Sequence, residues 1–302
     1  MSAVVALGGN ALMRPGERGT AAEQRANLRE ACAALRPLLR EERLVVTHGN
    51  GPQVGNELLR QERAAAEAPP LPLYLAVAQT QAEIGALIES ELEPVAGRPV
   101  VCLLTHVLVD EDDPAFREPT KPVGPFYDEA RARTLEAERG WQVVHDAGRG
   151  WRRVVPSPAP LEVVELNAIR SLLESGSIVV ACGGGGIPAT RRGEHLAGID
   201  AVIDKDRASS LLARSLGAER LVILTEVPAV YSGFGTDAQQ ELRELSVDDA
   251  EALVPELAAG SMRPKVRASI DFARATGREA LITSPAALRD ALEDRSGTRI
   301  HA

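Results

Sequence analysis

The sequence predicts an α/β fold in which helices cover both faces of a mainly parallel sheet. Short β-branched apolar runs alternate along the chain with stretches of helical periodicity, which is typical of buried parallel strands joined by helices. Several of these runs end in glycine-rich turns, and open α/β sheets bind their ligands where the carboxyl ends of the strands gather. A chain of 302 residues is long enough for one large domain of this class or two smaller ones.

The composition argues against several classes of function. The chain is 44% hydrophobic and 25% charged, which is ordinary for a globular protein. Its net charge of −9 argues against a general nucleic-acid or anionic-membrane binder. No apolar run is long enough to span a membrane and no basic leader precedes the first one, so we expect a cytoplasmic protein with no membrane partner. The widely spaced Cys32, Cys102 and Cys182 predict reduced, buried thiols.

The first two predicted strands, residues 3–7 and 44–47, each run into a turn rich in glycine and asparagine. Glycine lets backbone N–H groups approach an anionic ligand closely, but it also forms ordinary tight turns, so both interpretations stay open here. We interpret His48 as a hydrogen-bonding residue of its own turn. The two turns contain Gly8, Gly9 and Asn10, and Gly49, Asn50 and Gly51.

Helical sequence and one unusual insertion follow these turns. Thr20 and Glu23 have the spacing of a capping box, and Pro37 is expected to bend or end the helix that they start. Residues 64–72 are predicted to form a loop and residues 100–104 a strand. The proline-rich residues 119–125 exclude a helix or a central strand, so we expect a partly irregular excursion, a lid or a protruding subdomain.

The stretch from residue 177 to residue 216 carries the strongest signals. A β-branched run at residues 177–182 predicts a buried strand, and four glycines follow it, Gly184 and Gly185 among them. Further on, Asp206 precedes a helix that Gly217 is expected to end. Asp206 either caps that helix or organises charge beside Lys205, and the two roles are compatible.

The remaining segments repeat the alternation of strand and helix. Residues 221–225 and 280–283 predict buried strands, and Ser246 is expected to begin an acidic helix. Tyr231 and Met262 are interpreted equally as core residues or as ligand contacts. Further helices are predicted to open at residues 260–265, with Gly277 as the cap, and at Ser284 as N-cap with Pro285 at the first helical position.

The lysines point to phosphate chemistry. Of the 34 basic residues only Lys121, Lys205 and Lys265 are lysines, and each lies in a segment rich in glycine, proline or aspartate. Lysine is a compact point charge that fits among phosphate oxygens where the planar guanidinium of arginine does not. Phosphoryl transfer requires cations and N–H donors that hold the phosphates in line with an acceptor. The chain has neither a P-loop motif nor the motifs of protein kinases, so such an enzyme would have another architecture.

Dinucleotide binding is the main competing hypothesis. Residues 184–189 formally match G-x-G-x-x-A after a strand, and Asp204 and Asp206 lie at about the right distance. The fingerprint demands an immediate helix, however, and Pro188 followed by residues 191–194 shows no helical pattern.

Taken together, these segments resemble the carbamate kinases of the amino-acid kinase family. The proline-lysine excursion and the Arg-Arg-Val-Val-Pro-Ser-Pro run distinguish that group from acetylglutamate, aspartate and uridylate kinases. The segments that carry the resemblance span nearly the whole chain in order: residues 6–12, 47–55, 119–127, 152–158, 181–188, 201–206 and 260–266.

The resemblance implies a three-layer α/β/α sandwich and reversible transfer of a phosphoryl group between ATP and carbamate, giving ADP and carbamoyl phosphate. It also implies homodimers, and Mg²⁺ that binds through the nucleotide phosphates rather than through protein ligands. One domain would span residues 1–302. Its acceptor-binding half would be residues 1–176, with the protruding subdomain at about 112–155, and its nucleotide-binding half residues 177–302. ATP synthesis from carbamoyl phosphate in arginine catabolism would use the same site as the reverse direction.

The resemblance also assigns roles to individual residues. The transferred phosphate would lie along the first glycine turn, and the carbamate side along the second turn and the third. Lysines would neutralise the transferring and leaving oxygens, with one aspartate to orient them. The residues so implied are Gly8, Gly9 and Asn10 for phosphate; Gly49, Asn50, Gly51, Gly184 and Gly185 for carbamate; Lys121, Lys205, Asp206 and Lys265 for catalysis; and Val227, Tyr231, Met262 and Lys265 for the nucleotide.

Two positions depart from the family pattern. Arg263 stands where the family usually has glycine, and Ala86 where it favours an aromatic residue. The first could alter the geometry of the nucleotide loop or add a phosphate contact, and neither removes a proposed catalytic group. A second class of function stays open, namely a binding or regulatory protein that kept the fold and lost turnover. The three retained lysines argue against it.

Overall fold

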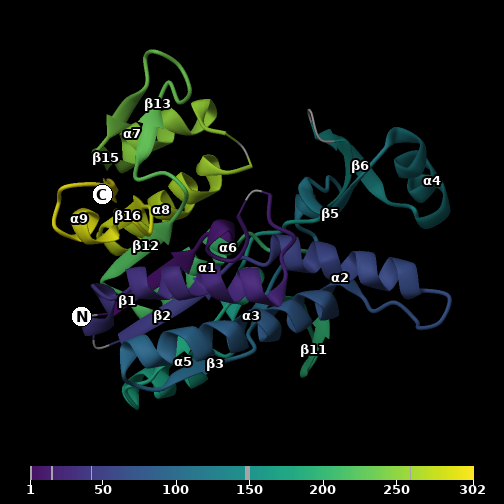
Figure 1. The fold of residues 1–302 in the computed structure, drawn as a ribbon, viewed down its shortest axis with the longest axis horizontal. Helices are drawn as coiled ribbons and strands as arrows, with labels where there is room; N and C mark the ends of the chain where they lie inside the picture. Colours follow the sequence, from purple (N-terminus) through teal and green to yellow (C-terminus); the bar gives the residue numbers. More distant parts are fainter. Residues whose placement is uncertain (1, 15, 42, 147–149, 259) are drawn as a thin grey trace.

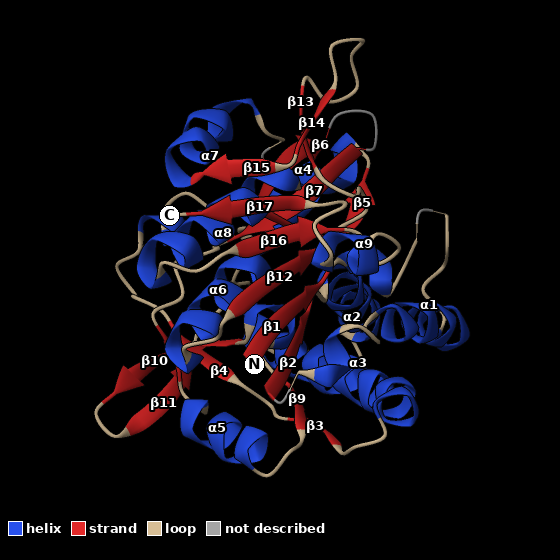
Figure 2. Ribbon diagram, turned by 90° about the vertical axis from the view of Figure 1, so that its left-hand side faces the viewer, coloured by secondary structure: helices blue, strands red, loops and turns tan. Residues whose placement is uncertain are grey.

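A single eight-stranded sheet runs through the protein (Figure 2). The computed structural model describes residues 2–14, 16–41, 43–146, 150–258 and 260–302. All neighbouring strands of the sheet are parallel except β16 and β17, which confirms the predicted mainly parallel sheet. In spatial order the strands are β15 (Glu244–Ser246), β17 (Thr298–His301), β16 (Ala280–Thr283), β12 (Arg220–Leu224), β1 (Ser2–Leu7), β2 (Arg43–His48), β9 (Ile178–Val180) and β3 (Val100–Cys102).

Helices cover both faces of this sheet, which gives the expected three layers (Figure 2). Successive strand residues point to opposite faces, so Val4 and Ala6 of β1 join one apolar cluster while Val5 and Leu7 join the other. One layer contains α5 (Leu166–Glu174), α6 (Lys205–Leu216), α7 (Val247–Leu253) and α8 (Met262–Thr276), and the other contains α1 (Ala21–Ala34), α3 (Leu73–Ala96) and α9 (Leu288–Leu292), with α2 (Gly51–Ala64) beside them.

Most of the predicted helix signals are confirmed. Thr20 and Glu23 form the capping box of α1, which ends at Ala34, before Pro37. Gly217 and Gly277 adopt left-handed backbone angles at the ends of α6 and α8.

One predicted helix start is wrong. Ser284 and Pro285 do not begin a helix, because α9 starts only at Leu288 and its N-cap is Ala287. The hydroxyl of Ser284 instead accepts a 3.3 Å hydrogen bond from the N–H of Ala287. Ser284 therefore stabilises a turn that precedes the helix.

The excursion after residue 110 forms a small subdomain that protrudes from the main body (Figure 1). As expected, the excursion is partly irregular: its proline-rich part is a strand, β5 (Lys121–Tyr127), whose pairing with β7 shifts register between Val123 and Tyr127. This strand lies at the edge of an antiparallel sheet in the order β5-β7-β6, where Pro122 and Pro125 leave no central hydrogen bond unmade. The other elements are β6 (Gln142–Asp146), β7 (Gly150–Val155) and α4 (Glu129–Arg139).

Cation–π stacking consolidates the subdomain. The guanidinium of Arg133 lies 4.3 Å from the ring centre of Trp151, and that of Arg153 lies 4.6 Å from the ring of Trp141. The sequence contains two tryptophans, so both belong to this subdomain.

Two further small sheets complete the fold. The four-stranded sheet follows the order β11 (His195–Gly198), β10 (Ile187–Arg192), β4 (His106–Leu108) and β8 (Glu162–Val163), and the hairpin joins β13 (Val230–Ser232) to β14 (Gln240–Leu242). The glycines at 183–185 form a 3₁₀ turn that leads into strand β10 rather than into a helix. This excludes the dinucleotide-binding hypothesis. None of the helices in the described residues combines the length and apolar character needed to cross a membrane.

Candidate active site

Two of the predicted glycine turns meet at the carboxyl ends of the strands. Gly184 has a φ of +65°, and a Cβ at this position would lie 2.1 Å from the side-chain nitrogen of Asn50. Only glycine therefore fits against the turn after β2. The Asn50 amide, which is buried, donates a 3.0 Å hydrogen bond to the hydroxyl of Thr80 and so fixes this contact.

The first glycine turn lies against the strand beside β1. A Cβ at Gly8 would lie 2.8 Å from the carbonyl oxygen of Leu224, so the turn packs on the end of β12. Gly9 and the backbone of Asn10 continue it as a 3₁₀ turn. The side chain of Asn10 lies outside the described part of the structure. Gly49 is near the lysine of α6, since its Cβ position is 3.9 Å from Cδ of Lys205, and Gly51 begins α2.

The start of α6 depends on Asp204. Its carboxylate oxygen Oδ1 accepts hydrogen bonds from the N–H groups of Asp206 at 3.0 Å and of Arg207 at 3.3 Å. Asp204 is therefore the N-cap of this helix, and the interpretation of Asp206 as the cap is wrong. Asp206 has the other role that we considered, which is to organise charge beside Lys205.

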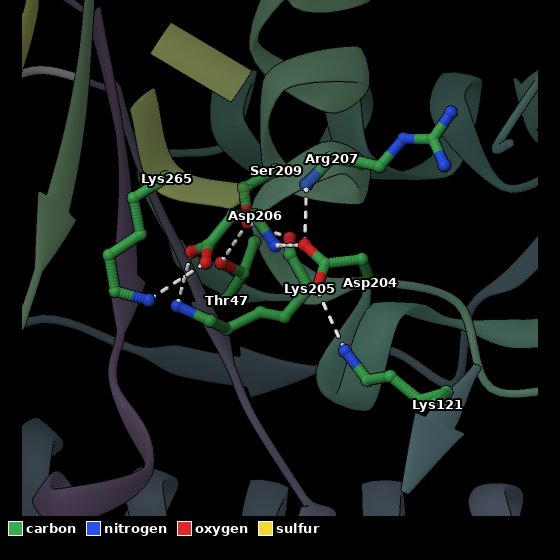
Figure 3. A network of polar contacts seen from close by, with 8 residues as sticks. All are labelled: Thr47, Lys121, Asp204, Lys205, Asp206, Arg207, Ser209 and Lys265. Carbon is green, nitrogen blue, oxygen red and sulfur yellow. Dashed lines mark hydrogen bonds and ion pairs between the residues drawn. The ribbon is translucent and has the colours of Figure 1, made fainter. Parts of the chain in front are cut away.

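Asp206 is shared by two lysines (Figure 3). Its side chain is buried; Nζ of Lys205 lies 2.7 Å from Oδ1 and Nζ of Lys265 lies 2.9 Å from Oδ2. The contact with Lys265 is a hydrogen bond. The contact with Lys205 is a close ion pair, and because an ammonium group has three N–H donors, this buried group keeps donors for another acceptor.

For both Asp206 and Lys205, burial and the charge of the ion-pair partner shift the pKa in opposite directions. Burial alone would raise the pKa of the Asp206 carboxyl, but the ammonium groups of Lys205 and Lys265 outweigh it and hold that pKa below its ordinary value. Burial lowers the pKa of Lys205; Asp206 opposes this shift, and the charge of Lys265 adds to it. Asp206 is therefore a carboxylate that holds two cations in a dry environment.

Lys121 reaches the same helix from the protruding subdomain. Its Nζ lies 2.8 Å from Oδ2 of Asp204, across 83 positions of sequence (Figure 3). The side chain of Lys121 is 33% exposed, whereas that of Lys205 is 11% exposed. All three lysines of the chain thus converge on the first turn of α6.

Hydrogen bonds tie this turn to the main sheet. The hydroxyl of Ser209 donates to the carbonyl oxygen of Lys205 at 2.7 Å and lies 2.6 Å from the hydroxyl of Thr47 in β2. Next to Thr47, Nδ1 of His48 lies 2.9 Å from the carbonyl oxygen of Gly49. Burial lowers the pKa of His48 to about 4 despite that hydrogen bond, so the imidazole is neutral at pH 7. His48 is a turn-forming residue, as interpreted.

A cavity of about 1170 Å³ lies beside this cluster. Residues that the sequence predicted for phosphate and nucleotide line it, namely Gly8, Gly9, Val227, Tyr231, Met262 and Lys265. Its lining includes neither Lys121 nor Lys205. Tyr231 is half-buried, and its ring centre lies 6.0 Å from that of Phe234, which is 66% exposed at the same cavity.

Asp204 and Phe234 are among the residues of this site that the sequence did not predict. Asp204 was named only as part of a motif, although an aspartate two residues before Asp206 and directly before a helical pattern is an N-cap signal. Phe234 lines the cavity but has no recognisable sequence signal, because a loop aromatic residue is equally compatible with a surface position. Within the described residues, no group of three or more histidines, cysteines or carboxylates is placed to hold a metal ion.

The geometry defines a class of protein. A cluster of lysines and carboxylates at a helix N-terminus, beside glycine turns and a large cavity, is suited to hold phosphate groups. Residues 1–284 match the amino acid kinase family, and the chain belongs to that family. It is therefore a phosphotransferase.

Several of its relatives are carbamate kinases. The chain is 44% identical over 300 residues to the carbamate kinase of Halobacterium salinarum, covering 98% of this chain and 97% of that one. It is 43% identical over 307 residues to the carbamate kinase of Pyrococcus horikoshii, covering 98% of each. The solved structure of the Giardia lamblia carbamate kinase bound to AMP-PNP superposes with a TM-score of 0.91 at 41% identity, covering 99% of this chain and 98% of that one.

Proposed function

We propose that the protein is a carbamate kinase, which transfers a phosphoryl group reversibly between ATP and carbamate and so interconverts them with ADP and carbamoyl phosphate. The observation that carries this proposal is the buried carboxylate of Asp206 between Lys205 and Lys265, with Lys121 held at the same helix end. Full-length similarity to carbamate kinases supports the choice of acceptor.

The proposed roles follow from the positions of the residues. The ammonium group of Lys205 is buried and has N–H donors available, so it would stabilise the oxygens of the phosphoryl group during transfer. Lys265 lines the cavity and would neutralise the leaving nucleotide oxygens, while Asp206 would hold both lysines. Lys121 would complete the charge from the side of the acceptor.

Substrate binding would divide between the two sides of the lysine cluster. The cavity beside Tyr231 and Met262 would bind the adenosine of ADP or ATP, and Gly8, Gly9 and Asn10 the transferred phosphate. The carbamate side would comprise Gly49, Asn50, Gly51, Gly184 and Gly185. The acceptor half of residues 1–176 and the nucleotide half of residues 177–302 would share one continuous sheet.

Mg²⁺ would enter with the nucleotide. Both carboxylate oxygens of Asp206 already face lysines, so they are poorly placed to serve as metal ligands. Mg²⁺ commonly binds through nucleotide phosphates with one or two protein carboxylates at most. Bound in this way, Mg²⁺ would supply positive charge to the phosphates, beside that of Lys205 and Lys265. Activity in excess chelator without added metal would contradict this arrangement.

The biological setting extends the same proposal. We propose ATP synthesis from carbamoyl phosphate, in arginine catabolism, as the physiological direction, and a cytoplasmic homodimer as the working form. Strand β3 is an edge strand of the main sheet, and Leu104, just beyond it, is 46% exposed, which is compatible with a covered edge in a dimer. Light scattering coupled to gel filtration tests the dimer.

An acceptor panel tests the function. The purified protein is assayed in both directions, with ATP and carbamate, acetate, N-acetylglutamate or UMP, and with ADP and carbamoyl phosphate. The proposal expects turnover with carbamate and carbamoyl phosphate that far exceeds turnover with the other acceptors. Binding of ADP without any turnover would instead show a regulatory protein that kept the fold.

A further inference from the structure

The carboxylate of Asp204 serves two different segments of the protein. Its Oδ1 accepts hydrogen bonds from the N–H groups of Asp206 and Arg207 in the first turn of α6. Its Oδ2 accepts a 2.8 Å hydrogen bond from Nζ of Lys121 at the start of β5 (Figure 3). One side chain therefore connects the helix that begins with Lys205 to the strand that begins with Lys121.

The subdomain has a separate attachment to the main body along α2. The phenol of Tyr127 donates to Oε2 of Glu62 at 2.9 Å, and the guanidinium of Arg131 donates to Oε1 of the same residue at 2.7 Å. A Cβ at Gly55 would lie 3.2 Å from the backbone of Gly124, so β5 also packs closely on α2. These contacts hold β5 at its far end and middle, and they leave the direction of the Lys121 side chain to its own partner.

The pair between Lys121 and Asp204 is poorly suited to a purely stabilising role. The lysine side chain is 33% exposed, so its contact with water weakens the attraction to Asp204, whose own side chain is 13% exposed. The pair does, however, place a third ammonium group beside Lys205 and Asp206. Three lysines face two carboxylates there, which leaves an excess of positive charge at a helix N-terminus.

We propose that Asp204 is a positioning residue, which holds the ammonium group of Lys121 at the reaction centre while it caps the helix that carries Lys205. The inference rests on the proposed function, because Lys121 must act on the transferred group for its placement to affect turnover. Asp204 itself contacts no reacting atom in this scheme. Its effect passes through Lys121.

The substitution Asp204→Asn separates the two roles of the carboxylate. Asparagine is as good an N-cap as aspartate, so the hydrogen bonds to the start of α6 are kept. Its amide carries no charge to hold the lysine. We expect kcat to fall by about 10–100-fold, the order of loss caused by a misplaced catalytic group, with the Kd for ADP within about two-fold of wild type. A kcat equal to or above that of wild type would overturn the proposal.

A double-mutant cycle tests whether the effect passes through Lys121. We expect Lys121→Ala combined with Asp204→Asn to be no slower than Lys121→Ala alone, because the second change removes the partner of a group already absent. Losses that multiply would show that Asp204 acts elsewhere and would overturn the proposal. The matched control is Asp128→Asn, at the N-cap of α4, whose side chain accepts from the N–H of Arg131 at 2.8 Å.

Amide hydrogen exchange gives a readout that does not depend on turnover. In Asp204→Asn we expect faster exchange confined to the start of β5, at residues 121–123, because the contacts of Gly124 and Tyr127 with α2 remain, and unchanged exchange at Asp206 and Arg207. Faster exchange at those two helical amides, with residues 121–123 unchanged, would show loss of the cap and overturn the proposal. If the wild-type protein lacked carbamate kinase activity, the proposed function would fail, while this measurement would still decide whether Asp204 fixes the start of β5.

Discussion

The two charge clusters at the start of α6 differ in how they are held. Asp206 is buried, Lys205 and Lys265 have side chains that are only 11% and 13% exposed, and all three belong to two packed helices of the main body. Lys121 is 33% exposed, and its pair with Asp204, which is as enclosed as Lys265, joins the main body to the protruding subdomain. A buried cluster is fixed before the substrate arrives, whereas a pair across a boundary forms only when the two parts are in contact. We therefore expect the first cluster to be preorganised for binding, and the second to contribute to catalysis only when the subdomain contacts the main body.

The largest expected effect is that of Lys205→Arg. The bulky planar guanidinium cannot replace an ammonium group that lies 2.7 Å from a buried carboxylate and that would contact phosphate oxygens in the proposed reaction. We expect kcat to fall about 10²–10³-fold, which corresponds to about 3–4 kcal/mol of transition-state stabilisation. Steady-state kinetics measures the loss, and circular dichroism checks that the variant folds. Activity within a few-fold of wild type would remove Lys205 from the mechanism.

Lys121→Ala should separate turnover from nucleotide binding. Because Lys121 comes from the subdomain and is absent from the lining of the cavity, we expect kcat and kcat/KM for carbamate to fall by about 10²-fold while the Kd for ADP, measured by calorimetry, is nearly unchanged. Lys265→Ala is the matched comparison. It should weaken ADP as well, since Lys265 lines the cavity. If Lys121→Ala abolished ADP binding, Lys121 would belong to the fixed nucleotide site.

The pH dependence of activity should report the buried cluster. Burial lowers the pKa of Lys205, so its neutral form replaces the cation at a lower pH than for an ordinary lysine, whose pKa is about 10.4. We therefore expect kcat to decrease at alkaline pH, with a midpoint below the ordinary lysine pKa, because activity is lost as Lys205 loses its proton. The same decrease should persist in Lys121→Ala. A decrease that disappeared in this variant would belong to Lys121 instead.

The smallest expected effect is that of Arg263→Ala. The guanidinium of Arg263 donates to the carbonyl oxygens of Leu257 at 3.1 Å and Pro255 at 2.9 Å, and so fastens one wall of the cavity to α8. Loss of these bonds should raise the Kd for ADP about three- to ten-fold and leave kcat unchanged. Arg267→Ala, at an exposed position of the same helix, is the control. Equal Kd values in the two variants would show that Arg263 does not shape the pocket.

Local sequence patterns were sufficient to predict much of the fold. The capping box at Thr20 and the glycine caps of α6 and α8 are short-range signals, and each was confirmed because the physical cause lies within one helix turn. The Ser-Pro signal at residue 284 failed for the opposite reason. The bond from Ala287 to the Ser284 hydroxyl closes a turn as readily as it opens a helix. Similarly, the prolines of β5 are compatible with a strand once that strand lies at an edge, which only the tertiary arrangement decides.

The candidate site was predictable in its residue types but not in its pairings. The rarity of lysine identified all three ammonium groups, and the structure brings them to one helix end. Their partners depend on contacts between segments 59 and 83 residues apart, from Asp206 to Lys265 and from Lys121 to Asp204. An Asp-Lys-Asp triplet does not reveal which aspartate caps the helix and which is buried. The packing of α8 and β5 decides it.

Both tryptophans lie in the protruding subdomain, so tryptophan fluorescence reports on this part of the protein. Trp141 and Trp151 each lie under an arginine side chain, so the intrinsic emission at long excitation wavelengths arises from this one part of the molecule. Any change in the solvation of the three-stranded sheet would alter the spectrum directly, while the main sheet and the cavity beside Tyr231 contain no tryptophan and would contribute no emission at these wavelengths. Movement of the subdomain during turnover can therefore be followed by stopped flow without a label and without a single substitution.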